Sequence, residues 1–188
     1  VHAQKPINRL EDLKGIKFRA ASRWVGESIK ALGGIPVGMP LPRLAEALTR
    51  NQVNGMFITW SITRPYKLSK LTNHHTEMHL YNSPFAMVMN KKKYHSLPAD
   101  LRKIIDANSG LELSKSLGKM WDDDAVRGRN VAVKLGNKIT SLSPAEEARW
   151  VKASQPAIDA WIKVANSKGK NGAQAFADAK MLVKKYSK

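Results

Sequence analysis

The sequence has 188 residues, of which 43% are hydrophobic, and it contains five tryptophans. This length suits one ordinary domain or two small lobes, and the apolar content is sufficient for a core. No apolar run approaches the ~18 residues that a membrane-spanning helix needs, and no signal-peptide pattern opens the sequence. The chain has no cysteine, which excludes disulfides, thiolate zinc sites and cysteine nucleophiles.

The formal net charge of +17 is the property that says most about partners. Basic side chains are concentrated in residues 47–99, where Glu77 is the sole acid, and in residues 163–188. Such a charge attracts phosphate backbones, but it also suits a solvated surface that draws in small anions. No helix-turn-helix or RNA-binding signature surrounds the basic runs. Composition therefore leaves a basic nucleic-acid-binding domain open as one interpretation.

The first part of the chain alternates between strand and helix patterns. Gly33-Gly34, followed by Pro36, is a strong helix stop, and alternating apolar residues before it indicate a strand. In chain order the patterns predict strands over 16–20, 35–39 and 53–59, and helices over 25–32, 41–48 and 61–71. This order is typical of an α/β fold with parallel strands and right-handed crossovers.

The second part of the chain predicts two more strands, over 75–81 and 85–90, and then mostly helix. A long helix is expected after Pro98, softened at Ser109-Gly110. Ser143-Pro144-Ala145-Glu146 has the pattern of a capping box with proline at the first helical position. A short strand over 139–142, the helix that starts at this box, and a last helix over 172–186 complete the prediction.

Catalytic and metal chemistry find little support in the residues. His75 and His79 would share one side of a strand with Glu77, but neighbouring surface histidines at a strand edge explain the pattern more simply. Asp122, Asp123 and Asp124 point in three directions on a helix, as on a solvated face. No phosphate loop, nucleophile elbow or paired-carboxylate arrangement is present. We therefore expect no enzyme activity, no metal site and no cofactor.

Arg19 lies at the end of the first predicted strand, just before a loop that contains Ser22 and Arg23. Ligand crevices of α/β proteins lie at the carboxyl ends of parallel strands. A guanidinium group there offers a two-pronged donor that matches a carboxylate. The residues alone nevertheless favour an arginine in a surface salt bridge.

Three segments favour the ligand-binding interpretation. Residues 10–19 read LEDLKGIKFR, residues 30–40 read KALGGIPVGMP, and residues 46–55 read EALTRNQVNG. In this order and at this spacing they closely resemble successive motifs of the solute-binding proteins of TRAP (tripartite ATP-independent periplasmic) transporters, the DctP-like family. Further segments fit the same family: Val88–Lys91 with Tyr94, Ser96–Leu101 and Leu142–Glu147. The resemblance spans nearly the whole chain.

The resemblance implies a periplasmic-binding-protein-like α/β lobe with a short parallel or mixed sheet, a long inter-lobe helix and C-terminal helices. Its expected parts are an inter-lobe connection (1–15), an α/β ligand-binding lobe (16–74), return strands (75–97), a long helix (98–136) and a C-terminal strand with helices (137–188). It also implies that a signal peptide and most of a first lobe precede Val1. Exposed surface meant for that lobe would favour self-association.

The resemblance assigns ligand contacts residue by residue. Arg19 takes the role of the strand-end arginine that grips a carboxylate. The other expected contacts are Ser22, Arg23, Met39, Leu41, Trp60 and Phe85. Among these, Trp60 and Phe85 imply a ligand with apolar or aromatic bulk.

The function implied is that of a periplasmic solute-binding subunit that captures a carboxylate-bearing organic anion. Such a subunit delivers its ligand to the TRAP membrane permease subunits. It is not an enzyme, needs no cofactor or metal, and binds no specific nucleic acid. A basic nucleic-acid-binding domain is the alternative.

Overall fold

The computed structural model describes residues 1–80 and 84–186. The first part forms β1 (His2–Ala3), the 3₁₀ helix η1 (Leu10–Leu13), β2 (Lys17–Ala20), α1 (Arg23–Ala31), β3 (Ile35–Gly38), η2 (Leu41–Arg43), α2 (Leu44–Thr49), β4 (Gly55–Met56), α3 (Trp60–Thr63) and η3 (Leu68–Lys70). The second part forms β5 (His74–Glu77), α4 (Lys91–His95), α5 (Ala99–Ala107), α6 (Gly110–Lys134), β6 (Lys138–Ser141), α7 (Pro144–Ser167) and α8 (Gly172–Tyr186).

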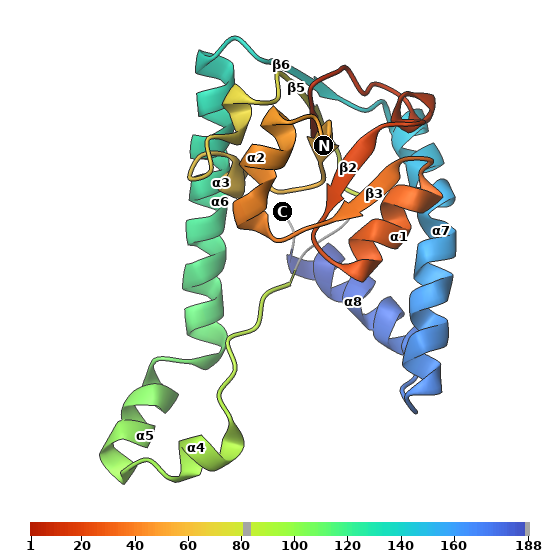
Figure 1. Ribbon diagram of the computed structural model, residues 1–188. Coiled ribbons are helices and arrows are strands. Elements are labelled where there is room, and N and C mark those ends of the chain that lie inside the picture. The colour runs from red at the N-terminus through yellow and green to blue at the C-terminus, as the bar shows by residue number, and fades with distance from the viewer. Residues whose placement is uncertain (81–83, 187–188) are drawn as a thin grey trace.

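The strands form one mixed six-stranded sheet in the order β3-β2-β4-β1-β5-β6 (Figure 1). β2 pairs in parallel with β3 and β4, β5 pairs in parallel with β6, and β1 is antiparallel to both of its neighbours. All strands except β1 therefore end at the same edge, which we call the carboxyl edge. This confirms the predicted α/β fold with a parallel or mixed sheet.

β1 is the strand that the sequence patterns missed, because two residues have no periodicity to read. It comes from the segment expected as a connection between lobes, yet it lies in the middle of the sheet. His2 pairs with Met56 on one side and with His75 on the other. β1 thereby joins the β3-β2-β4 part of the sheet to β5 and β6.

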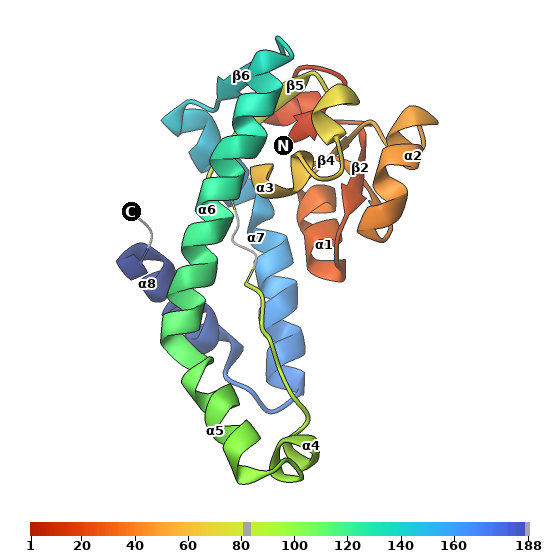
Figure 2. The ribbon, with the colours of Figure 1, turned by 90° about the vertical axis from the view of Figure 1, so that its left-hand side faces the viewer.

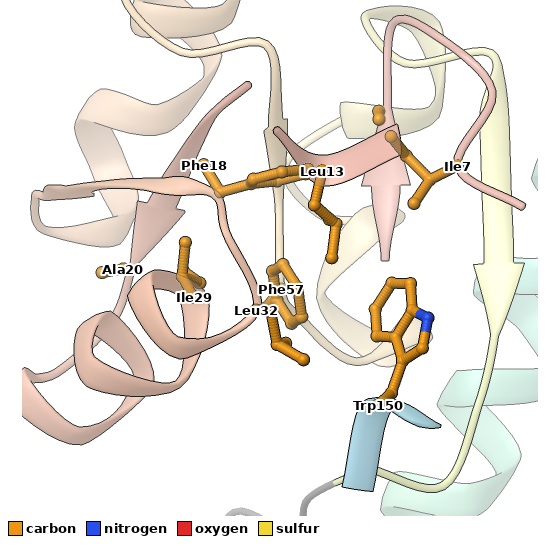
Figure 3. Packing of buried hydrophobic residues seen from close by; sticks show 9 residues of the cluster. Ile7, Leu13, Phe18, Ala20, Ile29, Leu32, Phe57 and Trp150 are labelled. Atoms are coloured by element: carbon orange, nitrogen blue, oxygen red, sulfur yellow. The ribbon is translucent and has the colours of Figure 1, made fainter. Parts of the chain in front are cut away.

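Two buried apolar clusters cover the two faces of the sheet. The first contains Phe18, Phe57 and Trp150 and is covered by α1 and α7 (Figure 3). The second contains Leu48 and Met56 and lies beneath α2. Phe18 and Arg19 are neighbours in β2 and point to opposite faces, and Arg19 is in register with Met56. Apolar side chains are therefore buried on both faces of the sheet, and this burial stabilises the fold. We call the sheet with the helices that cover it the sheet half of the molecule.

The segment from residue 84 to residue 123 extends away from the sheet, and we call it the arm. It comprises residues 84–90, α4, α5 and the first part of α6, with α4 and α5 beyond the end of α6 that is distant from the sheet (Figures 1 and 2). None of its side chains is buried.

The strand predicted over 85–90 is wrong: residues 84–90 have no regular secondary structure. Strands need a hydrogen-bonded neighbour, and no strand in the part of the chain that the structure describes pairs with these residues. Residues 85–89 are a continuous apolar run, but Phe85 is 75% exposed and Val88 is 89% exposed.

Two helix predictions also differ in detail. The helix expected over 61–71 is divided into α3 and η3, because Pro65 interrupts it and Lys67 adopts a left-handed backbone with φ of 52°. The helix expected over 98–136 is divided into α5 and α6, with Gly110 at φ of 79°. By contrast, α7 continues through Pro156. Over residues 1–80 and 84–186, no helix combines the length and the apolar character needed to cross a membrane.

Candidate ligand-binding site

α1 begins beside the carboxyl ends of β2 and β3. β2 ends at Ala20, and Ser22 caps the helix because its Oγ accepts a hydrogen bond from the backbone N–H of Val25, at 3.3 Å. The first turn of α1 contains no acidic side chain. The unpaired N–H groups and the dipole at this helix end favour a bound anion.

An open groove of about 590 Å³ lies at this helix entrance. Its walls come from the loop after β2 and from the end of β3 with the loop that follows. Three of the predicted ligand contacts line it, namely Ser22, Arg23 and Met39. The Arg23 guanidinium carbon lies 5.0 Å from the centre of the Trp24 ring. The groove is lined mostly by small residues, and Arg23 adds a positive charge to its lining.

Arg19 lies buried next to this groove, with 6% of its surface exposed. Its Nε donates a hydrogen bond to the backbone carbonyl of Met39, at 3.2 Å, so the side chain crosses from β2 to the loop after β3. Burying a guanidinium is costly unless it has hydrogen-bond partners. The bond to Met39 supplies one such partner and fixes the orientation of the guanidinium relative to a residue that lines the groove.

The remaining predicted contacts lie in different places. Leu41 packs against the second apolar cluster. Trp60 follows β4 at the same carboxyl edge, with its ring centre 4.5 Å from that of His2 and 4.7 Å from that of His75. Phe85 lies in the arm and stacks on Trp121, with ring centres 5.1 Å apart. The structure thus brings Ser22, Arg23 and Met39 together in the groove and links Arg19 to them through the Met39 carbonyl, while Arg19, Leu41, Trp60 and Phe85 are not among the lining residues.

A polar network beside Trp60 was not found by sequence reasoning. Glu77 ends β5, and its Oε1 accepts hydrogen bonds from Trp60 Nε1 at 2.9 Å and from Arg129 Nε at 2.8 Å. Burial alone would raise the pKa of Glu77, but the bonds from Arg129 and Trp60 hold that pKa below its usual value. The signal in the sequence was that Glu77 is the only acid between residues 47 and 99.

The histidines that suggested a metal site lie in different environments, and the expectation of surface histidines is wrong for one of them. His75 is buried, and its Nδ1 lies 2.7 Å from Nδ1 of His2, whereas the His79 side chain is exposed beside Glu147. Burial lowers the pKa of His75 to about 4, and it lowers the pKa of His2 well below its usual value. Among residues 1–80 and 84–186, no three His, Cys, Asp or Glu side chains gather closely enough to hold a metal ion.

The family of the chain follows from sequence comparison. Residues 1–164 match the family described as bacterial extracellular solute-binding protein, family 7, the DctP family. The chain belongs to this DctP family. One DctP relative is the C4-dicarboxylate-binding periplasmic protein of Shewanella loihica, which is 27% identical over 182 residues. The match covers 90% of this chain and 50% of the relative.

Solved structures of DctP-type proteins share the fold. A TRAP solute-binding protein from a marine metagenome, specific for aromatic acid ligands and bound to metahydroxyphenylacetate, is 39% identical with a TM-score of 0.93. The TRAP protein of Rhodoferax ferrireducens, with copurified benzoate, is 36% identical with a TM-score of 0.92. A third, from Shewanella oneidensis with bound succinate, is 27% identical with a TM-score of 0.73.

The DctP chain described here corresponds to only part of these proteins. It is covered to 100%, 99% and 86% by the three structures, but it spans 60%, 60% and 53% of their own chains. The curated relative likewise extends to about twice the matched length.

Proposed function

We propose that this DctP chain forms the ligand-binding part of a TRAP transporter subunit that captures a carboxylate-bearing organic anion with aromatic bulk. The observation that carries the proposal is the buried Arg19 at the carboxyl end of β2, beside an open groove at the start of α1. Ser22, Arg23 and Met39 line that groove and complete the proposed carboxylate end of the site.

The carboxylate preference rests on three sources of positive potential. Arg19 offers a planar donor whose Nε is already oriented by Met39. The first turn of α1 contributes backbone N–H groups without a competing acid. The net charge of +17 adds a long-range field that raises the association rate of anions. A small organic anion that carries a carboxylate can use all three.

The aromatic preference rests on side chains and on relatives. Neither Trp60 nor Phe85 lines the groove, and we propose them as an aromatic wall of the wider site, where ring contacts favour a planar ligand. The neighbours of 39% and 36% identity were solved with an aromatic acid and with benzoate, whereas the succinate-bound neighbour is 27% identical. Leu41 supports the loop at Met39 through the second apolar cluster and acts behind the site.

Compartment and partners follow from the family. The curated DctP relatives are named as periplasmic proteins. We therefore place the working protein in the periplasm, where it passes its ligand to TRAP membrane permease subunits. The family and its structural neighbours are solute-binding proteins and not enzymes. The comparisons give no support to the nucleic-acid alternative.

Calorimetric titration of the full-length protein tests the proposal. The ligands are benzoate, 3-hydroxybenzoate and succinate, measured in the same buffer. We expect saturable binding of the two aromatic acids and weaker binding of succinate. Absence of binding across these and further carboxylates would contradict the proposal. Submicromolar, sequence-selective binding of DNA or RNA in a gel shift at physiological salt would favour the other class instead.

A further inference from the structure

Two contacts fix the backbone of Trp60, from which the indole ring extends. Trp60 begins α3, and its carbonyl accepts a hydrogen bond from Thr63 Oγ1 at 2.8 Å. α6 crosses this point at Gly128, where an added Cβ would lie 2.0 Å from the Trp60 carbonyl oxygen. No side chain fits in that space, so glycine permits α6 to pack directly on the backbone of Trp60.

The N–H edge of the ring is held by Glu77 of β5, which forms an ion pair with Arg129 of α6. Arg129 follows Gly128 and makes two hydrogen bonds to Glu77, from Nε to Oε1 at 2.8 Å and from Nη2 to Oε2 at 3.4 Å. Glu77 Oε1 also accepts the indole N–H of Trp60, at 2.9 Å. A two-pronged arginine fixes the plane of the carboxylate, and the carboxylate then fixes the direction of the N–H group.

The buried histidine pair packs against the same ring. His2 Nε2 lies 3.1 Å from the carbonyl of Ile58, which can only accept, so this nitrogen carries the proton. His2 Nδ1 is then the acceptor in the 2.7 Å contact with His75 Nδ1. His75 Nε2 is left to accept from Asn137 Nδ2, at 2.9 Å. Both rings are neutral in this arrangement; the contact between His2 and Trp60 is edge-on, and that between His75 and Trp60 is tilted at 53°.

The contact with Glu77 occupies the single polar group of the Trp60 side chain. The indole N–H is its only donor, and Glu77 already accepts it. Trp60 follows β4 at the carboxyl edge, and the residue as a whole is partly exposed. A ligand at this edge therefore meets the apolar surface of the ring and not a hydrogen-bond donor.

We infer that Glu77, anchored by Arg129, is a positioning residue that holds Trp60 as an apolar platform for the ring of the ligand. This inference rests on the proposed function and names a residue pair that selects planar ligands. Arg129 also balances the charge of Glu77, so that a carboxylate beside the platform of an anion-binding site does not repel the ligand.

Benzoate and hexanoate separate positioning from charge. Both carry one carboxylate, but hexanoate is flexible and adapts to a displaced ring, whereas benzoate needs a flat surface in a set direction. Glu77→Ala removes the acceptor for the indole N–H. Glu77→Gln removes the charge but keeps an oxygen that can accept it. Calorimetry on the full-length parent and variants gives the two dissociation constants.

We expect Glu77→Ala to weaken benzoate binding about tenfold, as for a lost hydrogen bond to a charged group, and hexanoate binding less than about threefold. Glu77→Gln should keep the benzoate preference and shift both ligands alike. Asp124→Ala is the matched control, because it removes an exposed ion pair with Arg64 that also links α6 to the α3 region. It should leave both constants unchanged.

A ligand-independent measurement reads the position of the ring directly. The near-ultraviolet circular dichroism of Trp60, obtained as parent minus Trp60→Phe, should change in Glu77→Ala and persist in Glu77→Gln. Should Glu77→Ala fail to fold, Arg129→Lys keeps the charge, loses the fork and should show the same change in weaker form. Equal losses for both ligands in the alanine variant, or an unchanged tryptophan signal, would overturn the inference. If the parent binds no carboxylate at all, the proposed function and the platform role fail, while the tryptophan signal still decides whether Glu77 positions Trp60.

Discussion

The sheet half of the molecule and the arm both contain apolar side chains, but these side chains contact different things. Phe18 and Leu48 in the sheet half have no exposed surface, and each belongs to a cluster of buried neighbours. Met87 and Val88 in the arm keep 84% and 89% of their surface exposed. The difference teaches that the sheet half is stabilised by the burial of its apolar side chains, whereas the apolar side chains of the arm contribute little to stability because they stay exposed.

Local bonds maintain the shape of the arm. Asn90 caps α4 through its side chain, which accepts the backbone N–H of Lys93 at 3.2 Å. The hydroxyl of Tyr94 donates to Asp106 of α5 at 2.7 Å. Exposed hydrogen bonds of this kind each contribute about 1 kcal/mol or less. They hold α4 beside α5 without a core.

The largest effect on stability is expected in the sheet half. Phe18→Ala removes a fully buried ring that packs edge-on against Phe57, and we expect it to lower the free energy of unfolding by about 3–5 kcal/mol. Val88→Ala in the arm of the same 188-residue chain should cost less than about 0.5 kcal/mol. Urea unfolding followed by circular dichroism measures both. An equally large loss for Val88→Ala would mean that the arm is packed in solution.

A comparable effect, on ligand binding and not on folding, is expected for Arg19. Arg19→Ala should weaken carboxylate binding by about 2–5 kcal/mol, the typical result of truncating one partner of a buried charge pair. Arg19→Lys keeps the charge without the planar fork and should also bind worse. Arg50→Ala is the control, since Arg50 is an exposed member of an ion pair with Glu46. Calorimetry on the full-length protein decides the matter, and unchanged binding in Arg19→Ala would remove that residue from the site.

Lowering the pH should reduce the stability of the sheet half, because a histidine that is buried and neutral in the folded state becomes protonated on unfolding. Burial lowers the pKa of His75 to about 4, whereas an unfolded histidine titrates near 6.5. Between these values the unfolded state binds more protons, so stability falls as the pH drops from about 6.5 toward 4. The thermal midpoint of His75→Gln should vary less over this window than that of the parent. A parallel pH dependence in both proteins would show that His75 is not the group responsible.

The smallest effect is expected on self-association through the arm. The exposed apolar residues from Phe85 to Met89 should promote association of the 188-residue chain. Val88→Lys should weaken that association by about 1.5 kcal/mol, or roughly tenfold, because one apolar contact is lost and a charge is added. Light scattering over a concentration series measures the change. A parent chain that stays monomeric at high concentration would contradict the expectation.

Much of the sheet half could be predicted from local patterns. The segments 16–20 and 35–39 alternate in a way that matches β2 and β3, and Gly33, with φ of 90°, ends α1 where the sequence indicated. Ser143 caps α7 as expected, through its Oγ and the backbone N–H of Glu146. The carboxylate of Glu146 does not complete the capping box, because it accepts hydrogen bonds from Leu10 and Trp150 instead.

The sequence by itself therefore determined the elements whose signal is local: the alternation of strands, the glycine and serine ends of helices, and Arg19 at a strand end. Tertiary structure alone decided what depends on distant neighbours. β1 is a strand only because β4 and β5 lie on either side of it, and residues 85–90 are not a strand because no described strand pairs with them. The network of Trp60, Glu77 and Arg129 joins residues 17 and 52 positions apart. No short-range periodicity encodes such contacts, since they form only when the sheet and α6 have packed together.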